Sequence, residues 1–185
     1  MKKNIIGAVV GGILVFIIQF LSWGPLNLHS KAQQYTSKAD SILSYLGTQL
    51  GEDGSYFMPG YKPGSSSDEM DKQMKEMVGK PWAQVVYHKR MAGMDKMFMN
   101  MGRSLLVDMV IIWLLCWLLT QIPALSFGTV LTASIGTGII VFLNAPYTMH
   151  IWYGSFDLMA HFADALLEWG IAGLWLGWWL TRSKK

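Results

Sequence analysis

Four apolar stretches constrain this chain more than any other feature, because each approaches the roughly 20 residues that a helix needs to cross a lipid bilayer. They lie at residues 1–23, 104–122, 127–146 and 156–180. The composition agrees, since 52% of the residues are hydrophobic and 15% are charged, whereas soluble domains carry about 25% charged residues. The sequence therefore predicts an all-α integral membrane protein built as a bundle of four transmembrane helices.

The first apolar stretch has two interpretations. Lys2 and Lys3 resemble the basic start of a secretory signal peptide, and Ala32 lies in a loosely fitting cleavage site. However, the apolar run is long, and Ala32 lies far beyond its end. The run also contains Gly7 and Gly11, a GxxxG spacing that lets two helices approach closely. We therefore expect a retained transmembrane anchor.

Basic residues flank the first and last apolar stretches and predict the orientation. Lys and Arg concentrate in short cytoplasmic segments, and four spans return the chain to its starting side. We therefore expect both termini in the cytoplasm, in a bacterial inner membrane, and residues 24–103 outside. Ten Lys and Arg residues in that segment argue against this orientation, although long segments cross a membrane largely regardless of charge.

Residues 24–103 are expected to form a mostly helical extracytoplasmic insertion between the first two spans. Ser37 could cap a helix that Gly51 closes, and Ser67 could cap a second, methionine-lined helix. The stretch between them, residues 51–67, is rich in Gly, Pro, Ser and Tyr and predicts a loop. A third helix is expected to start near Trp82 and run towards the second span.

Polar side chains follow one face of the fourth apolar stretch. Successive helix residues turn by about 100°, so the four polar residues in its first half share an arc of about 60°. A further acid in the second apolar stretch would lie at a similar depth. Ionisable residues inside a membrane are by default candidates for function. The predicted intramembrane polar stripe consists of Asp108, Asp157, His161, Asp164 and Glu168.

Each member of the stripe also has a simpler interpretation. Asp157 follows a serine at a helix start, where an acid complements the helix dipole. His161 could be a hydrogen-bonded contact between helices, and Asp108 could pair with Arg103 or His161. Asp164 and Glu168, which lie one turn apart, could instead pair with a basic residue of a partner protein.

A second pair of small residues lies on roughly the opposite face of the fourth stretch. Gly173 and Gly177 repeat the GxxxG spacing of Gly7 and Gly11. Such spacings favour close helix packing within one chain or between copies. We expect these four glycines to lie at helix contacts. The expected partners of the chain are the lipid bilayer and either another membrane protein or a second copy of the chain.

Histidines and methionines suggest a metal site on the predicted outer side. All four histidines fall there, and the run HKRMAGMDKMFMNM at residues 88–101 has MxxM and MxM spacings. Thioethers prefer Cu(I), and imidazole suits copper and zinc. The run resembles the methionine-rich motifs of extracytoplasmic copper proteins, which implies copper or zinc as a cofactor. Methionine is also a flexible apolar filler that can meet lipid or a partner. The candidate ligands are His88, His150, His161, Met91, Met94 and Met97.

The sequence lacks the short motifs of common enzymes. It has no phosphate-binding GxxxxGK[ST] loop, no HExxH, no GxSxG and no CxxCH. Its single cysteine, Cys116, excludes an internal disulfide. Basic residues are interspersed with acids, which argues against nucleic acid as a partner.

Two classes of function remain open. The sequence favours a non-catalytic accessory or structural subunit of a larger membrane assembly. The alternative is a cation-handling membrane protein that relays protons or binds copper or zinc through the polar stripe. An intramembrane enzyme comes third, because no motif supports it.

Overall fold

A computed structural model describes residues 2–182, and the chain is 69% helical. It divides into two compact units, which we describe separately. The first, Met1–Gln34 together with Met94–Lys185, is called the bundle. The second, Tyr35–Gly93, is called the insert.

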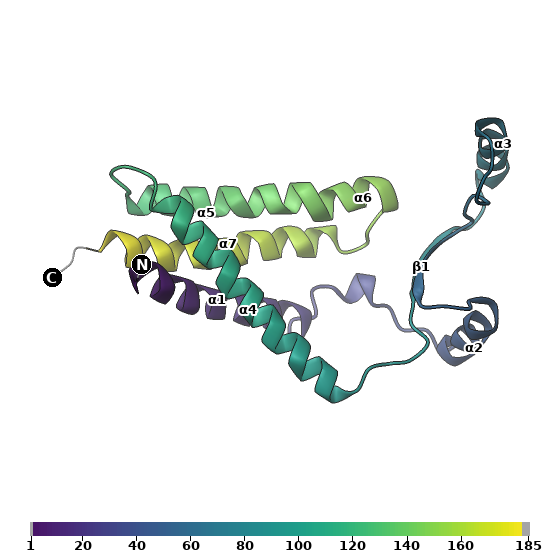
Figure 1. Ribbon diagram of the computed structural model, residues 1–185, viewed down its shortest axis with the longest axis horizontal. Coiled ribbons are helices and arrows are strands. Elements are labelled where there is room, and N and C mark those ends of the chain that lie inside the picture. Colours follow the sequence, from purple (N-terminus) through teal and green to yellow (C-terminus); the bar gives the residue numbers. More distant parts are fainter. Residues whose placement is uncertain (1, 183–185) are drawn as a thin grey trace. The chain divides into compact units, whose positions relative to one another are not determined.

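The bundle consists of long helices in which α1 and α7 form the centre. Helix α1 packs between α4 and α7, and α7 packs between α1 and α5. Figure 1 shows α1, α5 and α7 side by side, with α4 crossing them obliquely. A π-helical segment, η2, contains a proline and joins α5 to α6 without a break. The elements are α1 (Lys2–Trp23), the short η1 (Ser30–Ala32), α4 (Met94–Leu119), α5 (Phe127–Phe142), η2 (Leu143–Tyr147), α6 (Thr148–Tyr153) and α7 (Leu158–Thr181).

Within residues 2–182, three helical stretches are long and apolar enough to cross a membrane. They are Lys2–Trp23, Met94–Leu119 and Phe127–Tyr153. The expected fourth span coincides with α7, which is not among them because His161, Asp164 and Glu168 lower its hydropathy. Large aliphatic and aromatic side chains are exposed along α1 and α4, as lipid contact requires. The chain is therefore a helical, multi-pass membrane protein.

One half of the bundle has an apolar core. This apolar half lies where α1 begins and α7 ends, and the Lys3 ammonium donates to the Leu180 carbonyl oxygen at 2.8 Å there. The Trp175 indole N–H donates to the carbonyl oxygen of Gly7 at 3.0 Å. The core residues are Val15, Ile112, Leu115, Cys116, Leu119, Val130, Ala172 and Leu176.

Glycines bring the helices of the apolar half close together. A methyl group added at Gly12 would lie 2.7 Å from the Cα atom of Met109, so the backbones of α1 and α4 nearly touch. The four glycines with GxxxG spacing also lie at helix contacts. Gly7 lies against Cys116 and Trp179, Gly11 against Ile112, Gly173 against Ser134, and Gly177 against Phe127.

The insert contains two helices and a small sheet. Strand β1 (Gly54–Met58) pairs antiparallel with β2 (Ala83–Tyr87), and the helices are α2 (Ala39–Gln49) and α3 (Ser67–Met77). The predictions of a continuous loop at residues 51–67 and of a helix starting near Trp82 are therefore wrong. Strand β2 consists mostly of valine and tyrosine, and β1 contains adjacent tyrosine and phenylalanine; such residues favour extended backbone. The cap of α3 is Ser66 rather than Ser67, in a capping box with Glu69.

Candidate functional site

A turn after α1 carries His29 into the interior of the bundle. The Leu28 amide donates to the Ser22 carbonyl oxygen at 2.9 Å, which folds the chain back over the helix end. Asn27 adopts a left-handed conformation with φ of 47°, which asparagine tolerates better than most residues. As a result, the His29 residue is only 1% exposed, although it belongs to no long helix.

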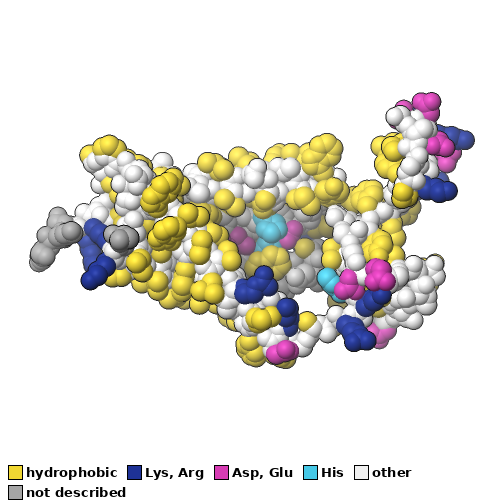
Figure 2. All heavy atoms as spheres, viewed as in Figure 1, with side chains coloured by type: hydrophobic (Ala, Val, Ile, Leu, Met, Phe, Trp, Pro, Cys, Tyr) yellow, Lys and Arg dark blue, Asp and Glu magenta, His cyan; other side chains and the backbone are white. Residues whose placement is uncertain are grey.

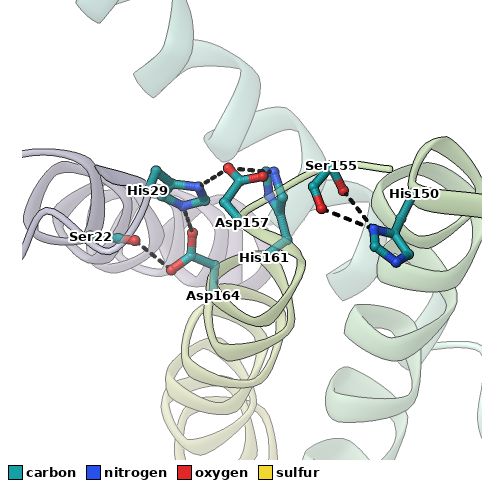
Figure 3. A network of polar contacts seen from close by, with 7 residues as sticks. All are labelled: Ser22, His29, His150, Ser155, Asp157, His161 and Asp164. Carbon is teal, nitrogen blue, oxygen red and sulfur yellow. Dashed lines mark hydrogen bonds and ion pairs between the residues drawn. The ribbon is translucent and has the colours of Figure 1, made fainter. Parts of the chain in front are cut away.

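His29 lies between two carboxylates at the start of α7 (Figure 3). Its Nδ1 is 2.7 Å from Asp157 Oδ2, and its Nε2 is 2.8 Å from Asp164 Oδ2. The Ser22 hydroxyl donates to the other oxygen of Asp164 at 2.6 Å. The Trp23 ring stacks on the imidazole with 3.7 Å between ring centroids. His29 is therefore fixed on both ring nitrogens and on one ring face.

The carboxylates favour a protonated His29. Burial alone would lower the pKa of this imidazole, but hydrogen bonds with Asp157 and Asp164 and their negative charges raise the pKa above its ordinary value. An ionised carboxylate only accepts hydrogen bonds, so His29 donates from both nitrogens when it carries a proton on each.

His161 extends the site towards the surface. Its Nε2 is 3.4 Å from Asp157 Oδ2, and its ring centroid is 4.7 Å from that of His29. One ligand atom each from His29, Asp157 and His161 lie within 4.8 Å of one another. In the part of the chain that the structure describes, no other group of three His, Cys, Asp or Glu side chains is arranged in this way.

A second polar layer lies deeper in the bundle, where α1, α4 and α7 meet. The Gln19 amide nitrogen donates to Asp108 Oδ1 at 3.3 Å and to Glu168 Oε2 at 3.5 Å. Asp108 is 3% exposed, and its second oxygen, Oδ2, has no hydrogen-bond partner among the residues that the structure describes. Two carboxylates therefore share one neutral donor in a region of low dielectric constant. We call these two layers together the polar half of the bundle.

The residues of the predicted stripe fall into these two layers. Asp157, His161 and Asp164 surround His29, whereas Asp108 and Glu168 meet at Gln19. Asp108 bonds to Gln19 instead of pairing with Arg103 or His161. Asp157 does occupy the N-cap position of α7, but its carboxylate makes no capping bond and contacts His29.

The predicted histidine and methionine ligands are not all gathered around His161. His150 lies in α6, and its Nδ1 is 3.0 Å from the Ser155 carbonyl oxygen (Figure 3). His88 belongs to the insert, 3.5 Å from Asp53. Met91, also in the insert, is fully exposed, and Met94 and Met97 are exposed in the first turns of α4.

Sequence reasoning missed three members of the site. His29, Ser22 and Gln19 all come from the region around the end of α1. His29 has no helical periodicity because it follows a turn, and Gln19 and Ser22 carry no charge that marks them in an apolar run. The available signal was the position of His29 just beyond the apolar stretch, within the segment WGPLNLH.

The arrangement has the chemistry of cation binding rather than of nucleophilic catalysis. Alternating carboxylate and imidazole groups within hydrogen-bond distance hold and exchange protons, and imidazole with carboxylate binds divalent metals. The Ser22 hydroxyl bonds to a carboxylate and not to a histidine base. No family model matches the sequence, and neither the curated proteins nor the solved structures gave a match. The function must therefore be argued from this geometry.

Proposed function

We propose that this protein is a cation-handling membrane protein that takes up protons at the His29 end of the bundle and holds them in its core. The observation that carries the proposal is His29, buried and bonded on both ring nitrogens to Asp157 and Asp164. A buried ion pair adds little to stability compared with apolar packing of the same volume. In a lipid-embedded bundle, ionisable residues of this kind mark ion or proton paths.

The proposal includes α7 as a fourth membrane span. Helix α7 packs between α1 and α5, and both α1 and the stretch Phe127–Tyr153 that begins with α5 are apolar enough to cross a bilayer. Helix α7 would therefore lie in the bilayer with them. The beginning of α1 also bonds to the end of α7 through Lys3 and Leu180. The basic residues at these ends favour the cytoplasmic side of a bacterial inner membrane, with the insert outside.

The deeper layer supports proton storage. Two like charges that face one another in a medium of low dielectric constant repel strongly, which disfavours ionisation of both groups. Asp108 and Glu168 have only the Gln19 amide between them, so at least one carboxylate is expected to hold a proton. The free Oδ2 atom of Asp108 is available for that proton.

The polar half ends inside the bundle. Beyond the Gln19 layer, the core contains Ile112, Cys116 and Leu176, and its described residues include no carboxylate or imidazole. A single chain would therefore hold protons on one side, rather than conduct them across the membrane. Transfer beyond this point would need a partner subunit or a second copy.

Infrared difference spectroscopy of the protein in lipid tests the proposal. We expect a reversible carbonyl-stretch band from a protonated carboxyl group when the pH is cycled between about 8 and about 5, the range of histidine-linked switches. The band should be lost when Asp108→Asn and Glu168→Gln are combined, because amides cannot take up a proton.

Asp95→Asn provides the matched control, since Asp95 is an exposed acid in the first turn of α4. This variant should retain the whole buried-carboxyl signal. If the double variant keeps the band, or if the wild-type protein has no such band, the proton proposal is wrong and the second candidate function gains support.

That second candidate is an accessory or structural subunit of a membrane assembly. The insert exposes apolar side chains that lipid would not reach if it lies outside the membrane, including Val78 at 79% and Val86 at 66%. Trp82 is also half exposed. Large exposed apolar side chains on a water-facing segment favour contact with another protein.

A further inference from the structure

We propose that His29, His161 and Asp157 bind a divalent transition-metal ion, with zinc as the best match, at the His29 end of the bundle. The inference rests on the proposed cation handling and names a second cation for the same site. One ligand atom from each of the three side chains lies within 4.8 Å of the others. Asp157 Oδ2 is the oxygen that lies nearest to both rings, facing His29 Nδ1 and His161 Nε2.

The two distances to Asp157 are close to those of a tetrahedral site, and the two histidines, whose ligand atoms lie within 4.8 Å of each other, would move together around the ion. Zinc binds imidazole nitrogen and carboxylate oxygen at about 2.0–2.2 Å, so neighbouring ligand atoms of a tetrahedron lie about 3.4 Å apart. His161 Nε2 and Asp157 Oδ2 are 3.4 Å apart. His29 Nδ1 and Asp157 Oδ2 are 2.7 Å apart and would separate by about 0.7 Å. The Nδ1 proton would be released to solvent, and two metal bonds would replace the hydrogen bond.

The outer shell of this site is already in place. A metal-binding histidine usually donates its second ring N–H to a carboxylate, which fixes the tautomer and orients the ring. His29 Nε2 lies 2.8 Å from Asp164 Oδ2, and the Ser22 hydroxyl holds Asp164 from its other side. Trp23 stacks on the His29 ring. Asp164 is therefore a positioning residue and not a ligand.

An ion can reach this position from the surface. The His161 side chain is 31% exposed, whereas those of His29 and Asp157 are almost completely buried. Figure 2 shows a histidine with acidic side chains on both sides, set back in a recess of the bundle surface. Three protein ligands leave the fourth zinc position for water or an exchangeable ligand, as in sites where zinc is not purely structural.

The ligand types discriminate among metals. Two imidazoles and one carboxylate suit zinc and other late first-row divalent ions, whereas magnesium and calcium prefer oxygen ligands alone. Cu(I) prefers thiolates and thioethers, and the three ligands contain no sulfur. The methionine run at residues 88–101 is therefore not needed for this site.

Zinc titration by isothermal calorimetry tests the inference, with full-length, chelator-treated protein purified in detergent without a polyhistidine tag. We expect one zinc ion per chain. His161→Gln and Asp157→Asn should each weaken binding by about tenfold or more, and Asp164→Asn by about 10–100-fold through loss of ring orientation. His150→Gln is the matched control and should bind like the wild type, because His150 contacts Ser155 instead.

His161→Gln is the decisive variant, because this partly exposed side chain can be replaced without emptying the core, and circular dichroism verifies the fold. Absence of zinc binding to the wild type overturns the inference. Equal binding by His161→Gln also overturns it and places the metal elsewhere, for instance at His88 in the insert. The proton band of Asp108 and Glu168 requires no metal, so it should persist in zinc-free His161→Gln. Failure of the zinc site is therefore distinguishable from failure of the proton proposal.

Discussion

The polar and apolar halves of the bundle use the same three helices, α1, α4 and α7, in opposite ways. In the apolar half, glycines such as Gly12 bring backbones together, and contact depends on shape. In the polar half, the helices meet through His29, Asp164 and Gln19, and contact depends on charge and hydrogen bonds. Apolar packing alone would hold such helices together, so the polar half needs a reason beyond stability.

The comparison also indicates how each half should respond to damage. In the apolar half, each substitution should lower the free energy of unfolding by an amount that depends on the side-chain volume removed or added at that position. A buried charge network depends on all its members, because removing one leaves the others without a partner. Three pairs of substitutions test this difference, from the largest expected effect to the smallest.

Replacement of His29 by leucine should have the largest effect. Leucine would leave Asp157 and Asp164 buried without their shared donor, and breaking a buried pair in this way costs about 3–5 kcal/mol. The free energy of unfolding in detergent, from denaturant titration, measures the loss. His150→Leu is the control and should lose much less, since the part-buried His150 bonds to Ser155 and contacts no carboxylate among the described residues. Equal losses would erase the distinction between the halves.

Gly12→Ala tests the apolar half. The added methyl group would lie 2.7 Å from the backbone of Met109, so α1 and α4 must move apart, at about 1–3 kcal/mol. Gly136→Ala in α5 is the control, because nothing lies within 4 Å of its added methyl group. That variant should be neutral or slightly stabilising, since alanine favours helix. A stable Gly12→Ala protein would mean that these helices are not closely packed.

The smallest effect is expected from the replacement of a serine by alanine, made separately in each half. Ser22→Ala removes the hydroxyl that donates to Asp164 and should cost about 1–2 kcal/mol. Ser134→Ala should be almost neutral, because this hydroxyl only donates to the Val130 carbonyl, which the helix already employs. The same denaturant titration decides, and a larger loss in Ser134→Ala would reverse the comparison.

Hydropathy was enough to predict the long helices but not all of their ends. Helix α1 ends at Trp23, as the first apolar stretch does. Helix α4 begins at Met94, ten residues before the predicted span, because Asp95, Lys96 and Arg103 lower the hydropathy of its first turns while its methionines still favour helix. The strands β1 and β2 were missed because their pairing joins segments that are far apart in sequence, and neither alternates clearly between polar and apolar residues.

The candidate site was accessible to sequence reasoning only where it lies on a helix. Helical rotation places Asp157, His161, Asp164 and Glu168 on one arc, and three of them contact His29 or Gln19 through hydrogen bonds. His29 occupies an irregular segment, where no period relates it to its neighbours. Its position follows from the turn after Trp23 and from packing against α7, and a single sequence contains neither.

The hydrogen bonds between the end of α1 and the start of α7 also have a consequence during synthesis of the chain. His29 leaves the ribosome 128 residues before Asp157, and 135 before Asp164. During that interval α1 has neither of its carboxylate partners, and the intervening helices must be placed in the membrane first. If α7 crosses the membrane as proposed, the proposed cation site would form only after α7 is inserted, and an incomplete chain would not bind an ion there. Insertion of α7 and assembly of the site would then be a single event.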